Sequence, residues 1–320
     1  MSPLLSHLLL NLAQIGFLMI FAPLVEGVLH RLEEIIQGKR GPSIWQSYRD
    51  IWKLFGKEEV ISEESSWVFR LAPLVAFVLP IFVVLLIPAL TAYPLFFAFM
   101  GDMVAVGFLM AIAGFFVALA GMDTGNVYAA VGASRTHMVG FLAEPVFILV
   151  FFSVSYVAGS TIPYVVNAAW GSSWSSMLQP AHLLVILAFF LLILADEGRI
   201  PVDSPAGKVE IAMIGHSKGL EYSGSSAALM KWGGAMKLMV LALVFVNVLV
   251  TPWGLAANTN WHALLLAIAL VLLKLLAFVL VLALVETTLA KLRLFRITEF
   301  LAVAFIICLF AVSVRLVGIG

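Results

Sequence analysis

The sequence predicts an all-α, polytopic integral membrane protein with about eight transmembrane helices and one cytoplasmic amphipathic helix. Of the 320 residues, 63% are hydrophobic and only 11% are charged, whereas a soluble domain carries about 25% charged residues. The apolar residues also gather in long runs, as expected of a chain that is solvated mainly by lipid. These two observations exclude a soluble globular protein.

The apolar runs give the expected spans, because a helix needs about 20 apolar residues to cross the hydrocarbon core. The runs are Leu5–Val25, Leu71–Leu90, Met103–Met122, Met138–Ala158, Met177–Ala195, Trp232–Val250, Ala263–Val285 and Ile297–Gly318. No internal repeat is evident, so residues 1–320 are expected to form a single membrane domain. Two long loops stand out, at 26–70 and 196–231.

Lysine and arginine alternate along the chain from loop to loop. The loops at 26–70, 123–137, 196–231 and 286–296 carry basic residues, and the loops between them carry none. The positive-inside rule places basic loops in the cytoplasm, so both termini are expected outside. We expect the protein in a prokaryotic cytoplasmic (inner) membrane.

The loop 26–70 contains apolar residues at helical spacing, with charged residues between them. The apolar positions are Ile44, Tyr48, Ile51, Trp52 and Phe55. This pattern predicts an amphipathic helix that lies on the membrane or under a partner protein.

Several charged residues fall within or at the ends of the expected spans, where ionised groups are costly and usually face protein or water. We take Asp123, Glu144, Lys237 and Lys274 as candidates for a proton path. The same residues could instead form structural ion pairs. Glu286, at the end of its span, is expected to be solvated.

The chain itself offers little for redox chemistry. Its single cysteine, Cys308, cannot hold an iron–sulfur cluster, which needs about four thiolates. We expect no catalytic residue, metal or other cofactor in this chain. The formal net charge of zero also argues against nucleic acid as a partner.

Short motifs that follow one another along nearly the whole chain resemble the H-subunit family of complex I. Within that family they are most similar to the membrane subunit of formate hydrogenlyase and of group 4 membrane-bound nickel–iron hydrogenases. The motifs are Lys39-Arg40-Gly41-Pro42, Tyr48-Arg49-Asp50-Ile51, Gly121-Met122-Asp123-Thr124-Gly125, Gly132-Ala133-Ser134-Arg135, Glu144-Pro145, Glu221-Tyr222-Ser223-Gly224, Met230-Lys231-Trp232-Gly233 and Leu289-Ala290-Lys291-Leu292-Arg293-Leu294.

This resemblance implies a membrane subunit of an ion-translocating oxidoreductase of hydrogenase type. The subunit would dock a soluble arm and couple redox chemistry to proton or sodium movement, and the enzymatic activity would belong to the whole complex. Its partners would be soluble subunits with iron–sulfur clusters and nickel–iron, together with antiporter-like membrane subunits. The residues implied at the docking junction are Arg40, Arg49, Asp50, Arg135, Glu197, Asp203, Glu210 and Glu221.

Two alternatives remain open at this stage. One is the quinone-cavity subunit of a complex I-type NADH dehydrogenase. Ala206 and Lys208 stand where complex I and formate hydrogenlyase usually place glutamates, which argues against the quinone-cavity pattern but does not settle the electron acceptor. The other is a secondary ion transporter that works alone, which the unduplicated spans and the basic amphipathic loop disfavour.

The alternation of basic loops predicts the outcome of a labelling experiment. Single cysteines placed beside Lys57, Arg135, Lys218 and Lys291 should react with a membrane-impermeant thiol reagent only from the cytoplasmic side. Labelling of any of these positions from outside would contradict the expected topology.

Overall fold

The computed structural model describes residues 3–95, 97–98, 101–172, 177–203, 217–258, 260–293 and 296–317. Almost all of its regular structure is helical. The helices are α1 (Pro3–Ile36), α2 (Gln46–Phe55), α3 (Trp67–Leu86), α4 (Met103–Met122), α5 (Val127–Ala158), α6 (Pro163–Gly171), α8 (Pro180–Asp196), α9 (Gly224–Leu243), α10 (Trp261–Thr288) and α11 (Arg296–Leu316), with a 3-10 turn η3 (Ser217–Gly219) and a π-helical segment η4 (Val244–Val250).

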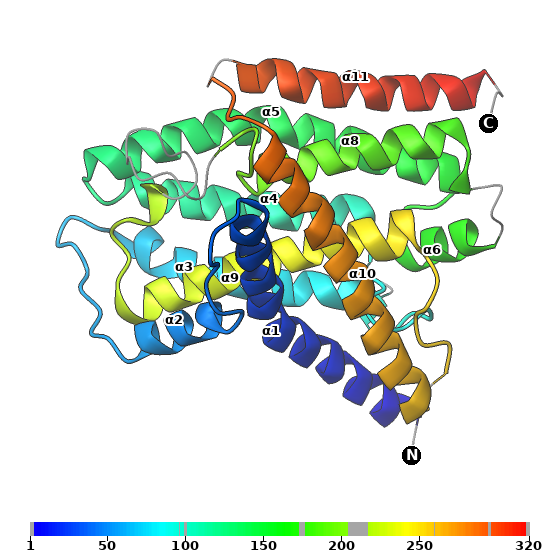
Figure 1. Cartoon of the computed structure of the whole chain (residues 1–320), viewed down its shortest axis with the longest axis horizontal. Helices are drawn as coiled ribbons and strands as arrows, with labels where there is room; N and C mark the ends of the chain where they lie inside the picture. The colour runs from blue at the N-terminus through cyan, green and yellow to red at the C-terminus, as the bar shows by residue number, and fades with distance from the viewer. Residues whose placement is uncertain are drawn as a thin grey trace.

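The predicted fold class is confirmed. Seven helices in the described part of the chain are long and apolar enough to cross a membrane, and α8 is a shorter apolar helix of 17 residues. At 1.5 Å per residue, α8 is about 26 Å long, close to the thickness of the hydrocarbon core. Most helices run side by side, while α1 and α10 cross them obliquely (Figure 1).

The four basic loops meet at one end of the bundle, which we call the basic end. Side-chain contacts join them there: Asp123 accepts hydrogen bonds from Ser66, Lys231 pairs with Asp50, and Lys291 pairs with Asp203. Both chain termini lie at the opposite end, called here the terminal end (Figure 1). The loops therefore alternate between two ends as expected, while the side of the membrane that each end faces stays a prediction.

Two helices extend well beyond the apolar runs that predicted them. Helix α1 continues to Ile36 and α5 begins at Val127, so Arg135 lies within a helix and not in a loop. Hydropathy marks where a helix leaves lipid. It does not mark where the helix ends, because Glu, Lys and Arg are good helix formers.

Helix α1 contains Pro23 near its middle, and this residue has no N–H to donate to the carbonyl of Met19. The indole Nε1 of Trp232, from α9, donates to that carbonyl at 3.0 Å. The hydroxyl of Tyr48, from α2, donates to the next carbonyl, that of Ile20. Figure 1 shows the change of direction along α1.

Irregular backbone is buried at the terminal end, where side chains bind its polar groups. The amide of Asn247, within η4, donates to the carbonyls of Pro88 and Ala89 at 3.1 Å. Asn167 donates to the carbonyl of Asn247 at 2.6 Å, and His182 bonds the carbonyl of Leu249 at 2.9 Å. Non-helical backbone at membrane depth needs such partners within the protein.

The predicted amphipathic helix is present as α2. Its buried residues, Ser47 and Ile51, pack toward α1 and α9, whereas Trp52 is 82% exposed. A large aromatic side chain on the outer face is suited to a membrane interface or a protein partner, as the sequence predicts.

Close packing of α3 against α9 gives a test of this arrangement. A Cβ on Gly233 would lie 2.5 Å from the carbonyl oxygen of Ala76, whereas a Cβ on Gly234 would meet nothing within 4 Å. We expect Gly233→Ala to destabilise the protein by about 1–3 kcal/mol, the usual cost of overpacking. Gly234→Ala should leave the thermal unfolding temperature in detergent unchanged or slightly raised. Equal unfolding temperatures for the two variants would contradict this packing.

Candidate functional site

Buried charge is concentrated at the basic end, where α1, α8, α9 and α10 leave the apolar region. The last turns of α1 contribute Glu26, His30 and Glu33, whose spacing of four and three residues puts them on one helix face. His30 Nε2 lies 3.9 Å from Glu26 Oε1, and His30 Nδ1 lies 3.4 Å from Glu33 Oε2. Both ring nitrogens therefore face a carboxylate.

Arg199 connects α1 to α10. Its Nη1 lies 3.8 Å from Glu33 Oε1, and its Nε lies 3.6 Å from Glu286 Oε1. Arg199 is 7% exposed and Glu286 is 5% exposed, so the expectation that Glu286 is solvated is wrong. The turn after α8 that carries Arg199 is closed by its backbone, with Arg199 N–H donating to the carbonyl of Leu194 at 2.9 Å.

A second set of charges lies beside the first. Lys237 Nζ, from α9, is 2.7 Å from Asp196 Oδ2 and 3.7 Å from Glu197 Oε1 at the end of α8. Desolvation raises the pKa of the Glu197 carboxyl, although Lys237 opposes the shift. Desolvation also lowers the pKa of the Lys218 ammonium, in η3, to about 8. Burial at the basic end therefore favours the neutral forms of both the Glu197 carboxyl and the Lys218 amine.

The structure distributes the four proton-path candidates over four separate surroundings. Lys237 belongs to the buried set just described, whereas Asp123 binds the backbone and hydroxyl of Ser66. Lys274 donates to the carbonyls of Thr251, at 2.7 Å, and Trp253, which are left open where η4 ends. It therefore stabilises irregular backbone at membrane depth.

Glu144 lies where the sequence did not predict it. Its side chain is exposed on the outer surface of the chain, so the chain itself does not bury this carboxylate. It lines a narrow groove between α4 and α5 with Gly107, Phe108 and Ile148. Charged residues within spans usually face protein or water, but an apolar span alone does not reveal which side of a helix faces lipid, the protein interior or a partner.

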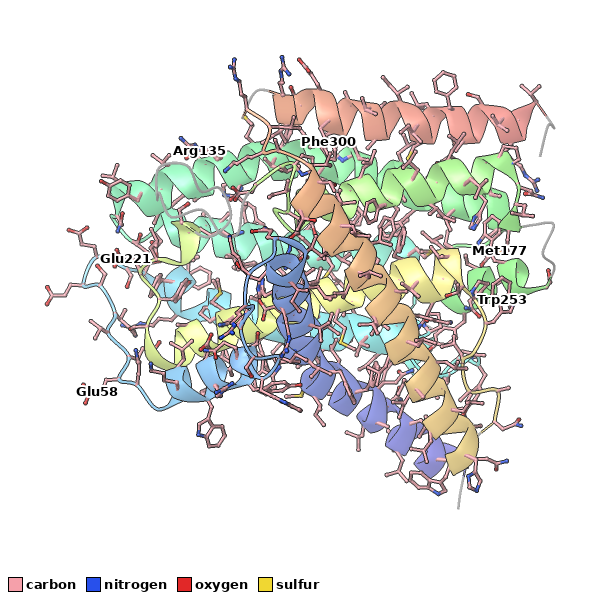
Figure 2. All side chains as sticks on the ribbon, in the orientation of Figure 1. Glu58, Arg135, Met177, Glu221, Trp253 and Phe300 are labelled. Atoms are coloured by element: carbon pink, nitrogen blue, oxygen red, sulfur yellow. The ribbon has the colours of Figure 1, made fainter. Side chains whose placement is uncertain are left out.

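Most of the predicted docking residues lie at the basic end. Arg40 and Arg49 are exposed, and Asp50 pairs with Lys231 at 2.6 Å. The remaining predicted residues are placed as follows: Arg135 lies in the early turns of α5, Glu197 faces Lys237, Asp203 pairs with Lys291 at 2.7 Å, Glu221 accepts from Asn126, and Glu210 lies outside the described residues. Figure 2 shows Arg135 and Glu221 at this end, with Met177 and Trp253 at the other.

Sequence reasoning missed the cluster made by Glu26, His30, Glu33, Arg199 and Glu286. The first three residues were assigned to a loop, which hid their common helix face. Continuing the 3.6-residue period of α1 past Val25 would have revealed it. The contacts of Arg199 with two helices that are distant in the sequence could not be predicted from one sequence alone.

In the described part of the chain, no group of three or more His, Cys, Asp and Glu side chains is arranged to hold a metal ion. Cys308 is buried in α11. The charged residues at the basic end are instead arranged in ion pairs and hydrogen bonds, a chemistry suited to binding and passing protons.

Fold and site together define a polytopic, all-α membrane subunit with its buried charges gathered at one end. Residues 9–317 match the family model described as NADH dehydrogenase. The chain therefore belongs to this family, in agreement with the resemblance to complex I that its sequence motifs carry.

The chain is also similar to three individual proteins. The chain is 37% identical to formate hydrogenlyase subunit 4 of Escherichia coli K12 over 85% of its own length and 87% of the relative's. It is 36% identical to hydrogenase-4 component C of the same organism, over 88% and 87%. A chain in the membrane-bound sulfane sulfur reductase, an archaeal respiratory membrane complex, shares the fold with a TM-score of 0.81 at 23% identity, over 95% of this chain and 99% of that one.

The pairing of Lys237 gives a testable difference between two lysines of α9. Lys237→Met would leave Asp196 and Glu197 without their cation, and breaking a buried pair costs about 3–5 kcal/mol. Lys231→Met removes a half-exposed pair with Asp50 and should cost less than about 1 kcal/mol. We expect a marked loss of folded protein in detergent for the first variant only. Equal yields and unfolding temperatures would show that Lys237 is not needed by its partners.

Proposed function

We propose that this chain is the membrane subunit of a multisubunit, ion-translocating oxidoreductase of hydrogenase type. It docks soluble subunits at its basic end and couples their redox chemistry to the movement of protons or sodium ions. One observation above all supports this proposal: exposed residues predicted for docking, such as Arg40 and Arg49, lie at the same end as the buried charges around Arg199 and Lys237. A conformational change in a docked partner can therefore alter the electrostatic surroundings of groups that bind protons.

The similarity to hydrogenase-type proteins supports this assignment, because it extends over most of the chain and most of both relatives. The redox centres would lie in partner subunits that carry iron–sulfur clusters and nickel–iron. The positive-inside rule supports a location in a prokaryotic cytoplasmic membrane, with the basic end in the cytoplasm and both termini outside.

Glu144 supports a second kind of partner, an antiporter-like membrane subunit. A carboxylate on the lipid-facing surface of a helix is costly, by about 2.5 kcal/mol or more at the bilayer centre. A neighbouring membrane subunit seated on the groove of α4 and α5 would remove Glu144 from lipid and give it a route for proton exchange.

A quinone-reducing complex is the second candidate, because the family model itself is that of an NADH dehydrogenase. The two candidates share the docking and coupling roles and differ in the electron acceptor. Ala206 and Lys208 replace glutamates that complex I and formate hydrogenlyase both usually carry, so they argue against the quinone-cavity pattern but do not by themselves favour the hydrogenase type.

The function is tested in vesicles that contain the complete complex, with hydrogen turnover and proton uptake measured together. Wild-type vesicles should couple the two. Glu144→Gln keeps the shape and hydrogen bonding of the side chain but cannot titrate, so we expect normal assembly with proton uptake reduced at least about tenfold. That reduction corresponds to about 1.4 kcal/mol on the translocation barrier.

Ile148→Gln is the matched control, because it places an amide in the same groove and keeps the carboxyl group. It should assemble and translocate protons. Undiminished proton uptake by Glu144→Gln would remove Glu144 from the path, and a complex without hydrogen turnover would contradict the hydrogenase type.

A further inference from the structure

The carboxyl groups of Glu33 and Glu286 come from α1 and α10 and lie against the same guanidinium. Arg199 Nη1 is 3.8 Å from Glu33 Oε1, and Arg199 Nε is 3.6 Å from Glu286 Oε1. Two buried carboxylates that share one cation repel each other when both are ionised, which favours a bound proton on one of the two.

The charges around this pair agree with one bound proton. Arg199 faces both carboxyl groups, and His30 faces Glu33 on one side and Glu26 on the other. Three carboxyl groups therefore share two basic side chains. Lys231, from α9, acts on Glu26 from farther away and is paired with Asp50. With His30 and Arg199 charged, one proton on a carboxyl group makes the cluster neutral.

The cluster is buried, so a net charge on it would be costly. The side chains of Arg199 and Glu286 are 8% and 3% exposed, and an uncompensated charge at such a site is strongly destabilising. The ion pairs are also long, at 3.4 to 3.9 Å. One oxygen each of Glu26, Glu33 and Glu286, and Nη1 of Arg199, are buried without a hydrogen bond. The cluster thus has hydrogen-bonding capacity that a mobile proton can use.

We propose that Glu33 and Glu286 form a proton-binding site that holds one proton between them, with Arg199 as the shared counter-cation. His30 relays protons from this pair to Glu26, because its two nitrogens face Glu33 and Glu26. Arg199 belongs to the turn that directly follows α8, so a displacement of that turn changes the charge that the pair experiences. The site deepens the proposed function by giving the docked redox arm a proton to move, but its existence does not depend on translocation.

Infrared spectroscopy of the purified complex tests the site directly. A protonated carboxyl group has a C=O stretching band that is distinct from that of a carboxylate and shifts in heavy water. At neutral pH we expect a wild-type-minus-variant difference spectrum to contain this band for both Glu286→Gln and Glu33→Gln, since other protonated carboxyl groups of the complex cancel in the difference. Asp203→Asn is the matched control: Asp203 is equally buried but has its own lysine, Lys291, at 2.7 Å, so the band should remain.

Glutamine resembles a protonated glutamic acid, so at least one of the two single variants should assemble at wild-type yield. Failure of both to assemble would overturn the proposal, as would a band that persists in either variant. If the variants lose the band but the wild-type complex moves no ions, the proton site is supported and only the coupling function is refuted. If the complex couples redox chemistry to ion movement but the band does not depend on Glu33 and Glu286, the coupling function is supported and the proton site is refuted.

Discussion

A polar group placed away from water must find its partner within the protein, and in a chain with so little polar surface this requirement determines where the helices can stop and bend. At the terminal end, Asn247, Asn167, His182 and Lys274 bind carbonyls that irregular backbone leaves open. At the basic end the same requirement pairs charges across α1, α8, α9 and α10.

The fold was largely predictable because lipid acts on composition in a simple way. Apolar runs about 20 residues long and the alternation of basic loops were sufficient for the number and order of the spans. The boundaries were less predictable, since α1 and α5 continue as helices into charged sequence. The pairing of helices was beyond sequence reasoning, because residues such as Gly233 reveal a close contact only when the backbone of α3 lies against them.

The site was predictable in its residue types but not in its connections. Lys237 and Glu197 were both singled out, and the structure brings them together because α8 ends beside α9. Glu144 and Lys274 were grouped with Lys237 only because all are charged residues within spans, and they serve different surroundings. Arg199 was counted only as one more basic residue of a loop. Its two carboxylate partners lie on helices more than 80 residues away in either direction, at Glu33 and Glu286, and pairings of that kind depend on tertiary structure.

Helix α1 bends at Pro23, and the bend divides it into two segments (Figure 1). The apolar segment lies in the bundle, and the other segment carries Glu26, His30 and Glu33. The carbonyl of Met19, which Pro23 leaves without its helical donor, is bound by Trp232 of α9, and Tyr48 of α2 donates to the next carbonyl. Helices α9 and α2 therefore both contact α1 at its bend. A partner bound to the exposed face of α2 would lie close to this bend, and a change in the bend angle would displace Glu33 farther than Glu26, which lies only three residues after Pro23.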